Sequence, residues 1–139
     1  MKLLFDSNVL LASLVARGLC ADLVRFAAGL HDITEITVCY CPAIEKEVMR
    51  HLRGKLEGSK AQCTLVQGLF SAITCIPDGT HWQPPADFPD PDDAPIIGAA
   101  LAAGVDLFVT GDKALPALGE ISGLAIRSPR DAFILLRGL

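Results

Sequence analysis

The sequence predicts a single α/β domain with a three-layer α/β/α arrangement, in which helices cover both faces of a mainly parallel central sheet. Short runs of β-forming residues alternate along the chain with segments of helical periodicity. Parallel strands need crossover connections of the kind that such helices supply. The chain has 139 residues, 51% of them hydrophobic, so it can bury a sizeable core. With no repeat, low-complexity run or linker in the sequence, we expect one domain over residues 1–139.

Two strands and four helices are expected in the first half of the chain. KLLFD and EITVCY are short runs of β-forming residues, whereas Ile44, Val48 and Leu52 recur at the spacing of a helix face. Gly58 is expected to end that helix, and Ser59 to cap the next one. Strands are therefore expected at 2–6 and 35–40, and helices at 8–18, 21–31, 42–56 and 59–73.

The second half of the chain continues the alternation. A proline-rich loop at 77–91 leads to an alanine-rich helix that Gly104 is expected to end. Ser128 followed by Pro129 predicts a helix N-terminus, because serine is a good cap and proline fits the first helical turn. Strands are expected at 74–77, 106–110 and 124–128, and helices at 93–103 and from 129 onwards.

The charge of the chain argues against a protein that coats nucleic acid. The formal net charge is −4 and the sequence pI is about 5.2, whereas such proteins are strongly basic. A nucleic-acid partner must therefore contact a local basic patch. The segment RHLRGKLEGSK offers one candidate, with Arg50, Arg53, Lys55 and Lys60, although a solvated helix face is the favoured interpretation of these residues.

The cysteine content and the N-terminal sequence indicate the cellular compartment of the protein. Five cysteines, an odd number without a CxxC pair, favour buried thiols over a disulfide framework or a zinc site. Asp6 and Asn8 interrupt what would be the apolar core of a signal peptide. No later run reaches about 18 uncharged apolar residues. We therefore expect a cytoplasmic protein.

Acidic residues gather at both ends of the segment PDPDDAPIIGAALAAGVDLFVTGD, residues 89–112. Asp6 and Asp112 each follow a predicted strand, and ligands of parallel sheets bind beyond the carboxyl ends of the strands. Asp93 precedes a helix expected to begin at the same edge, and either Asp92 or Asp93 is expected to be its N-cap. Because clustered carboxylates repel one another, the pattern favours a bound divalent metal.

A fourth acid is expected from the helix at 42–56, which offers two candidates. Glu45 falls near the middle of the apolar arc of this helix, whereas Glu47 lies at its margin. An acid at the margin can reach a pocket without entering the core. Periodicity therefore gives Glu47 a slight preference and leaves Glu45 as the alternative.

Four segments together resemble the successive motifs of PIN-domain proteins, in particular the bacterial, VapC-like branch of toxins from toxin–antitoxin pairs. The segments are LLFDSNVLLASL, CPAIEKEVMRHL, DPDDAPIIGAALAAGVDLFVTGDKAL and IRSPRDAFILL. The resemblance covers essentially the whole chain. It implies a PIN-like nuclease domain whose catalytic and metal-binding acids are Asp6, Glu47, Asp93 and Asp112.

The resemblance also implies the supporting residues and the chemistry. Asn8 and Thr110 match small polar positions that support the pocket, while Asp92 lies beside it and Lys113 could meet a phosphate. The implied activity is a Mg²⁺- or Mn²⁺-dependent endoribonuclease that cleaves single-stranded RNA. The carboxylate donor set suits these ions, which prefer oxygen ligands. The implied partners are an antitoxin protein and a second copy of the chain.

Two other functions are compatible with the acids. One is a metal-dependent phosphatase or DNA nuclease, and the other is a non-catalytic PIN-like module that binds RNA or protein. FDSNVL lacks a second aspartate two residues after Asp6, which weakens the case for an aspartyl-phosphate phosphatase. The presence of all four matched acids argues against a non-catalytic module.

The apolar content of the chain predicts a homodimer. With 51% hydrophobic and 20% charged residues, the chain has more apolar material than it can readily bury, so part of it is expected to face another copy. The first two predicted helices are apolar over much of their circumference. The expected interface lies near Leu14, Leu23 and Phe26.

Overall fold

A mainly parallel sheet organises the computed structural model, which describes residues 1–31, 33–54 and 60–138. The sheet has the strand order β3-β2-β1-β4-β6-β5. All pairings between neighbours are parallel except that of β5 with β6, which is antiparallel. The strands are β1 (Lys2–Phe5), β2 (Thr37–Tyr40), β3 (Thr74–Cys75), β4 (Leu107–Val109), β5 (Glu120–Ile121) and β6 (Leu124–Arg127).

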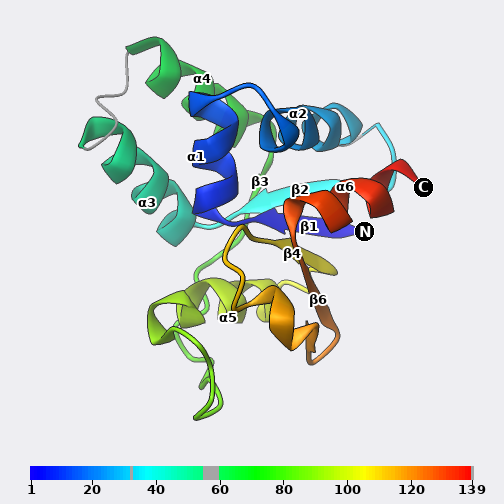
Figure 1. Cartoon of the computed structure of the whole chain (residues 1–139). Helices are drawn as coiled ribbons and strands as arrows, with labels where there is room; N and C mark the ends of the chain where they lie inside the picture. Colours follow the sequence, from blue (N-terminus) through cyan, green and yellow to red (C-terminus); the bar gives the residue numbers. More distant parts are fainter. Residues whose placement is uncertain (32, 55–59, 139) are drawn as a thin grey trace.

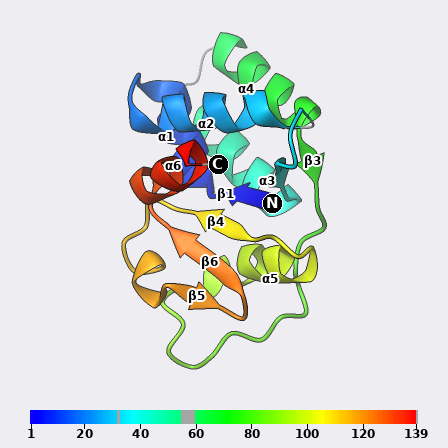
Figure 2. The same cartoon turned by 90° about the vertical axis from the view of Figure 1, so that its right-hand side faces the viewer.

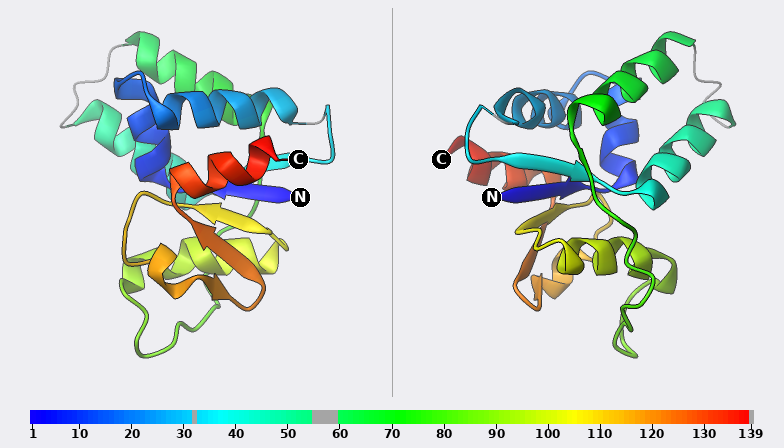
Figure 3. Two further views of the ribbon diagram at one scale, coloured as in Figure 1. Left: turned by 45° about the vertical axis from the view of Figure 1, so that its right-hand side comes forward. Right: turned by 180° about the vertical axis from the view of Figure 1, so that it is seen from behind.

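Helices cover both faces of the sheet, which confirms the predicted α/β/α fold. Figure 1 shows α1, α2 and α6 on one face and α5 on the other, and the two views of Figure 3 show the same layers. The helix α3 rises from the edge of the sheet and is followed by α4. The helices are α1 (Ser7–Val15), α2 (Leu19–Leu30), α3 (Pro42–Arg53), α4 (Lys60–Ala72), α5 (Ala94–Ala102) and α6 (Pro129–Arg137), with 3-10 turns at Pro91–Asp93 and Pro116–Leu118.

Strand β1 lies in the middle of the sheet, and the later strands are added first on one side of it and then on the other. From β1 the chain adds β2 and then β3 on one side, and β4 then pairs with the other side of β1. Figure 2 shows β4, β6 and β5 following in order on that side. The carboxyl ends of β1 and β4 meet there, where the Asp6 amide donates to the Val109 carbonyl at 2.8 Å. Such a switch point is where open α/β sheets bind their ligands.

The loop after β3 packs closely on α5. Gly79 donates its amide to the carbonyl of Pro95 at 2.9 Å. Trp82 packs edge-on against Phe88, with ring centroids 5.4 Å apart, and lies over Gly98. Because glycines stand on both sides of this contact, the loop and helix backbones approach to a distance that no side chain would allow.

The element boundaries agree with the sequence predictions to within a few residues, with one strand missed. Ser128 caps α6 by accepting the Asp131 amide at 3.2 Å, and Gly104 follows α5 with a φ of 69°, both as predicted. The antiparallel edge strand β5 was not predicted. The expected end of the helix at 42–56, its stop at Gly58 and the Ser59 cap lie outside the described residues.

The structure confirms one expected cap position and contradicts two other expectations. Asp93 is the N-cap residue of α5, as predicted for one of Asp92 and Asp93, but its side chain makes no capping hydrogen bond. A 3-10 turn precedes α5, and Asp90 caps that turn by accepting the Asp92 amide at 3.0 Å. Cys75 is exposed rather than buried, since it lies on the edge strand β3. Leu23 is fully buried in the core and cannot contribute to an interface, whereas Leu14 is half-buried and Phe26 is exposed.

We predict that Gly79→Ala destabilises the fold. A Cβ at this position would collide with the backbone of Gly98 and Ala99, and backbone cannot move aside as a flexible side chain can. The expected loss of stability is about 1–3 kcal/mol or more, measured by urea denaturation. Gly29→Ala is the control, because its Cβ would meet nothing within 4 Å inside α2, so this change should be neutral or stabilising. Equal effects of the two changes would contradict the prediction.

Candidate functional site

Asp6 is a buried carboxylate at the point where β1 ends. It is only 5% exposed and is the N-cap of α1, where one carboxylate oxygen accepts the Ser7 amide at 2.8 Å. The other oxygen accepts the Thr110 hydroxyl at 2.8 Å. Burial raises the pKa of Asp6, as do the nearby carboxylates of Glu47 and Asp112, while the hydrogen bonds from Thr110 and Ser7 oppose this rise.

Asn8 and Thr110 join the ends of β1 and β4 around Asp6. The Asn8 amide nitrogen lies 3.4 Å from both an Asp6 oxygen and the Thr110 hydroxyl, and its carbonyl oxygen accepts the Gly111 amide at 2.9 Å. The Thr110 side chain is fully buried. Its oxygen accepts the Asp112 amide at 3.1 Å. These contacts hold Asp112 in a fixed turn next to Asp6.

Asp93 lies at the start of α5 and faces the same group of acids. Its pKa is raised to about 7, first by burial and then by the negative charges of Asp6, Asp90, Asp112 and Glu47. Four acids from separate parts of the chain therefore repel the ionised form of Asp93. The repulsion is evidence that these side chains face one shared region at the switch point.

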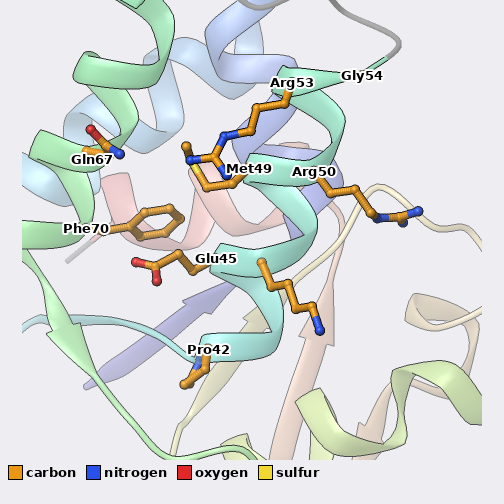
Figure 4. A pocket seen from close by; sticks show the side chains of 9 residues that line it. Pro42, Glu45, Met49, Arg50, Arg53, Gly54, Gln67 and Phe70 are labelled. Carbon is orange, nitrogen blue, oxygen red and sulfur yellow. The ribbon is translucent and has the colours of Figure 1, made fainter.

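The two glutamates of α3 point to different places. Glu47 acts electrostatically on both Asp6 and Asp93, so it lies on the side of the acids. Glu45 lines a separate groove with Pro42 and Phe70, between α3 and α4, as Figure 4 shows. The structure therefore brings Glu47, and not Glu45, to the other acids.

The remaining candidates lie at the rim of the site. Asp92 is exposed, and its carboxylate is not among the charges that raise the pKa of Asp93. Lys113 is exposed and follows Asp112 directly, at the carboxyl end of β4. Sequence reasoning missed Asp90, which caps the 3-10 turn and also acts on Asp93. The signal was present, since Asp90 is the first acid of the DPDD motif.

The site offers the oxygen ligands that a hard divalent cation prefers, but its acids do not form a complete coordination shell. The side chains that face one another carry carboxylate, hydroxyl and amide oxygens, which Mg²⁺ and Mn²⁺ prefer. Within residues 1–31, 33–54 and 60–138, no three His, Cys, Asp or Glu side chains lie close enough to form an assembled metal site. Mg²⁺ keeps several waters and needs only one or two direct carboxylates, so these residues fit such an ion.

Comparison with known proteins identifies the family that the chain matches. The family model described as PIN domain matches residues 2–114, a range that includes all four acids. One chain of a crystallised VapBC2 complex from Rickettsia felis, bound to a DNA fragment from its promoter, has a similar fold, with a TM-score of 0.66 and 11% sequence identity. The match covers 92% of this chain and 98% of that one. No curated protein sequence matches.

A further structural finding concerns membranes. In the part of the chain that the structure describes, no helix has both the length and the apolar character needed to cross a bilayer.

We predict that ionisation of Asp93 destabilises the metal-free protein. Its pKa rises on folding from 3.8 to about 7, so the folded state holds a proton that the unfolded state has lost, and stability should fall as the pH rises through this window. In buffer with EDTA, Asp93→Asn should therefore melt higher than wild type at pH 8. After allowance for solvent screening we expect about 1 kcal/mol, or roughly 3 °C.

The same change should have little effect at pH 4, where wild-type Asp93 is protonated. Asp92→Asn is the matched control, because Asp92 is exposed and does not act on Asp93; it should leave the pH dependence as in wild type. A melting difference between wild type and Asp93→Asn that stays constant from pH 4 to pH 8 would contradict the assignment.

Proposed function

The chain belongs to the PIN-domain family, and on that premise we propose that it is a metal-dependent endoribonuclease that cleaves single-stranded RNA. The observation that carries this proposal is the position of Asp6 and Asp112 at the switch point of the sheet, where the Thr110 side chain bonds to both, while the charges of Glu47 and Asp112 help to raise the pKa of both Asp6 and Asp93. A fold that gathers four carboxylates here gains most when a cation binds among them. We assign these four residues as the metal-binding and catalytic acids.

Each acid has a supporting structure suited to this role. Asp6 is held by hydrogen bonds from Thr110 and Ser7, so its carboxylate cannot turn away from the site. Asp112 is held through its amide by Thr110, and one of its own oxygens accepts the Ala114 amide at 2.9 Å. This leaves the other Asp112 oxygen available to a ligand. Preorganisation of this kind avoids reorganisation costs during the reaction.

The proposed chemistry is hydrolysis of a phosphodiester. When bound, Mg²⁺ or Mn²⁺ supplies the positive charge that draws the phosphate to an otherwise repulsive site and that makes water a better nucleophile. Asp6, Glu47, Asp93 and Asp112 hold this charge in place, and Asn8 and Thr110 orient Asp6. Lys113, exposed beside Asp112, contacts a phosphate oxygen of the substrate.

We also propose that the chain is the toxin of a toxin–antitoxin pair and acts in the cytoplasm. Its fold neighbour belongs to a VapBC2 complex, which supports a dedicated protein partner for this chain. A basic tail of an antitoxin would complement the acidic site and compete with the metal. A second copy of the chain is the other proposed partner, through apolar residues that are at least partly exposed, including Leu14 and Phe26.

Cleavage of a panel of single-stranded RNAs tests the proposed activity. With Mg²⁺ or Mn²⁺, wild type should cleave RNA, and Asp6→Asn and Glu47→Gln should each lose on the order of 100-fold or more in rate, because each removes a charge that the metal needs. Glu45→Gln is the matched control on the same helix and should keep most of the activity. Cleavage of DNA or of a phosphomonoester, with RNA left intact, would favour the alternative enzyme classes.

Metal binding should also be measurable as a rise in the melting temperature of the protein. Because the ion binds the folded site and not the unfolded chain, Mg²⁺ or Mn²⁺ at ten times its Kd should add about 1.4 kcal/mol, a rise in Tm of roughly 4 °C. Asp93→Asn should shrink this rise, whereas Glu45→Gln should preserve it. A Tm that does not respond to either ion at millimolar concentration would remove the support for a metal site.

A further inference from the structure

The helix α3 carries exposed cations beside the acid that it contributes to the site. Lys46, Arg50 and Arg53 are exposed, and all three line the groove between α3 and α4, which has a volume of about 890 Å³. The floor of the groove is apolar, with Met49 and Phe70 almost completely buried. One helix therefore joins the acidic site to a groove with a basic rim.

Within the described residues, these cations form no ion pair. In the described part of the chain, the one ion pair within 4.0 Å joins Arg25 to Asp22 on α2, so Lys46, Arg50 and Arg53 form none there. Unpaired cations that line a groove are free to bind an anionic ligand.

Helix geometry places Arg50 between the acids and the groove. Arg50 follows Glu47 by three residues, so it lies about 60° around the helix and about 4.5 Å further along its axis. Arg53 lies another step of the same size in the same direction. Figure 4 shows Arg53 extending across the groove towards Gln67 of α4, while Arg50 projects from the other side of α3. Around the helix, Arg50 therefore lies between Glu47 and the groove, and Arg53 extends into the groove itself.

The end of the groove at the start of α3 carries the opposite charge. Glu45 lies there, close to Phe70 and Pro42, and a polyanion would be repelled from it. A chain of phosphates that enters from the acidic site would therefore stay on the side of Arg50 and Arg53. An RNA strand has this chemistry, because each of its linkages carries one negative charge.

We propose that Lys46, Arg50 and Arg53 form a track along α3 that binds the phosphates flanking the cleaved bond of single-stranded RNA. The inference rests on the proposed nuclease function and adds the path of the substrate. The three cations are positioning residues, since they hold the strand and do not touch the reacting phosphate. Their cooperation with the acids also explains how a chain with no general basic surface binds RNA.

A structural role for the same residues makes a different prediction. Arg50 and Arg53 lie in the last turn of α3, where cations stabilise the helix dipole by about 0.3–1 kcal/mol. If that were their whole contribution, neutral variants would lose stability and bind RNA as wild type does. Binding and its salt dependence therefore separate the two roles.

The test measures binding of a labelled single-stranded RNA to the full chain in EDTA, where no cleavage occurs, over a series of salt concentrations. The double variant Arg50→Gln/Arg53→Gln should bind about tenfold more weakly or worse, and the slope of log K against log salt should fall by roughly 0.7 for each arginine removed. Arg25→Gln is the control for the loss of a positive charge elsewhere: it removes one such charge, where the double variant removes two, from an exposed position on α2, and it should change neither quantity.

Cleavage kinetics with metal supply the second readout. The double variant should raise KM by a similar factor and leave kcat within about twofold, as expected for residues that bind substrate and transition state equally. The charge-retaining variant Arg50→Lys/Arg53→Lys should restore most of the salt slope, and it keeps the test valid if the neutral double variant fails to fold.

The possible outcomes distinguish a failure of the proposed RNA track from a failure of the proposed nuclease function. If wild type binds RNA with the expected arginine dependence but never cleaves it, the track stands and the proposed function fails. If wild type cleaves RNA and the double variant has unchanged affinity, salt slope and KM, the track is wrong and the function stands. If wild type shows no measurable affinity for single-stranded RNA either in EDTA or with Mg²⁺, the track is wrong as well.

Discussion

The hydrogen bond between the Thr110 hydroxyl and the Asp6 carboxylate is the contact on which the site depends. A carboxylate that is 5% exposed is costly to bury unless other groups bond to it. Thr110 and Ser7 supply these bonds at 2.8 Å each. Since Asp6 follows β1 and Thr110 follows β4, this one contact fixes the relative position of the two loops at the switch point of the sheet.

The rest of the acidic site is built outward from this contact. Thr110 also accepts the Asp112 amide, and Asn8 bridges Asp6 to Gly111, so the β4 loop is held by side chains of the β1 loop. Asp93 reaches the same region because the helix that it precedes runs back along the sheet to feed β4. Burial, and after it the charges of the neighbouring acids, raises the pKa values of Asp6 and Asp93, as is common where carboxylates are kept together at a functional site.

Short sequence signals correctly predicted where several helices begin and end. The Ser128 cap and the glycine that follows α5 were predicted correctly, because the start and the end of a helix depend on a few neighbouring residues. The strand β5 was missed although Ser122 and Gly123, both with positive φ, form a turn typical of hairpins. Two residues are too short a run for strand periodicity. Asp90 was missed because the helix was expected to begin directly at residue 93, without the preceding 3-10 turn that Asp90 caps.

The sequence by itself determined the alternation of strands and helices, and with it the parallel sheet and the edge at which Asp6 and Asp112 lie, because crossover connections bring the carboxyl ends of parallel strands together. It did not decide between Glu45 and Glu47, which periodicity separated only slightly. Only the tertiary structure did so, by packing α3 with Glu47 on the side of the acids and Glu45 in the groove towards α4. The direction that a helix face takes is set by the elements packed around it, and these lie far away in the sequence.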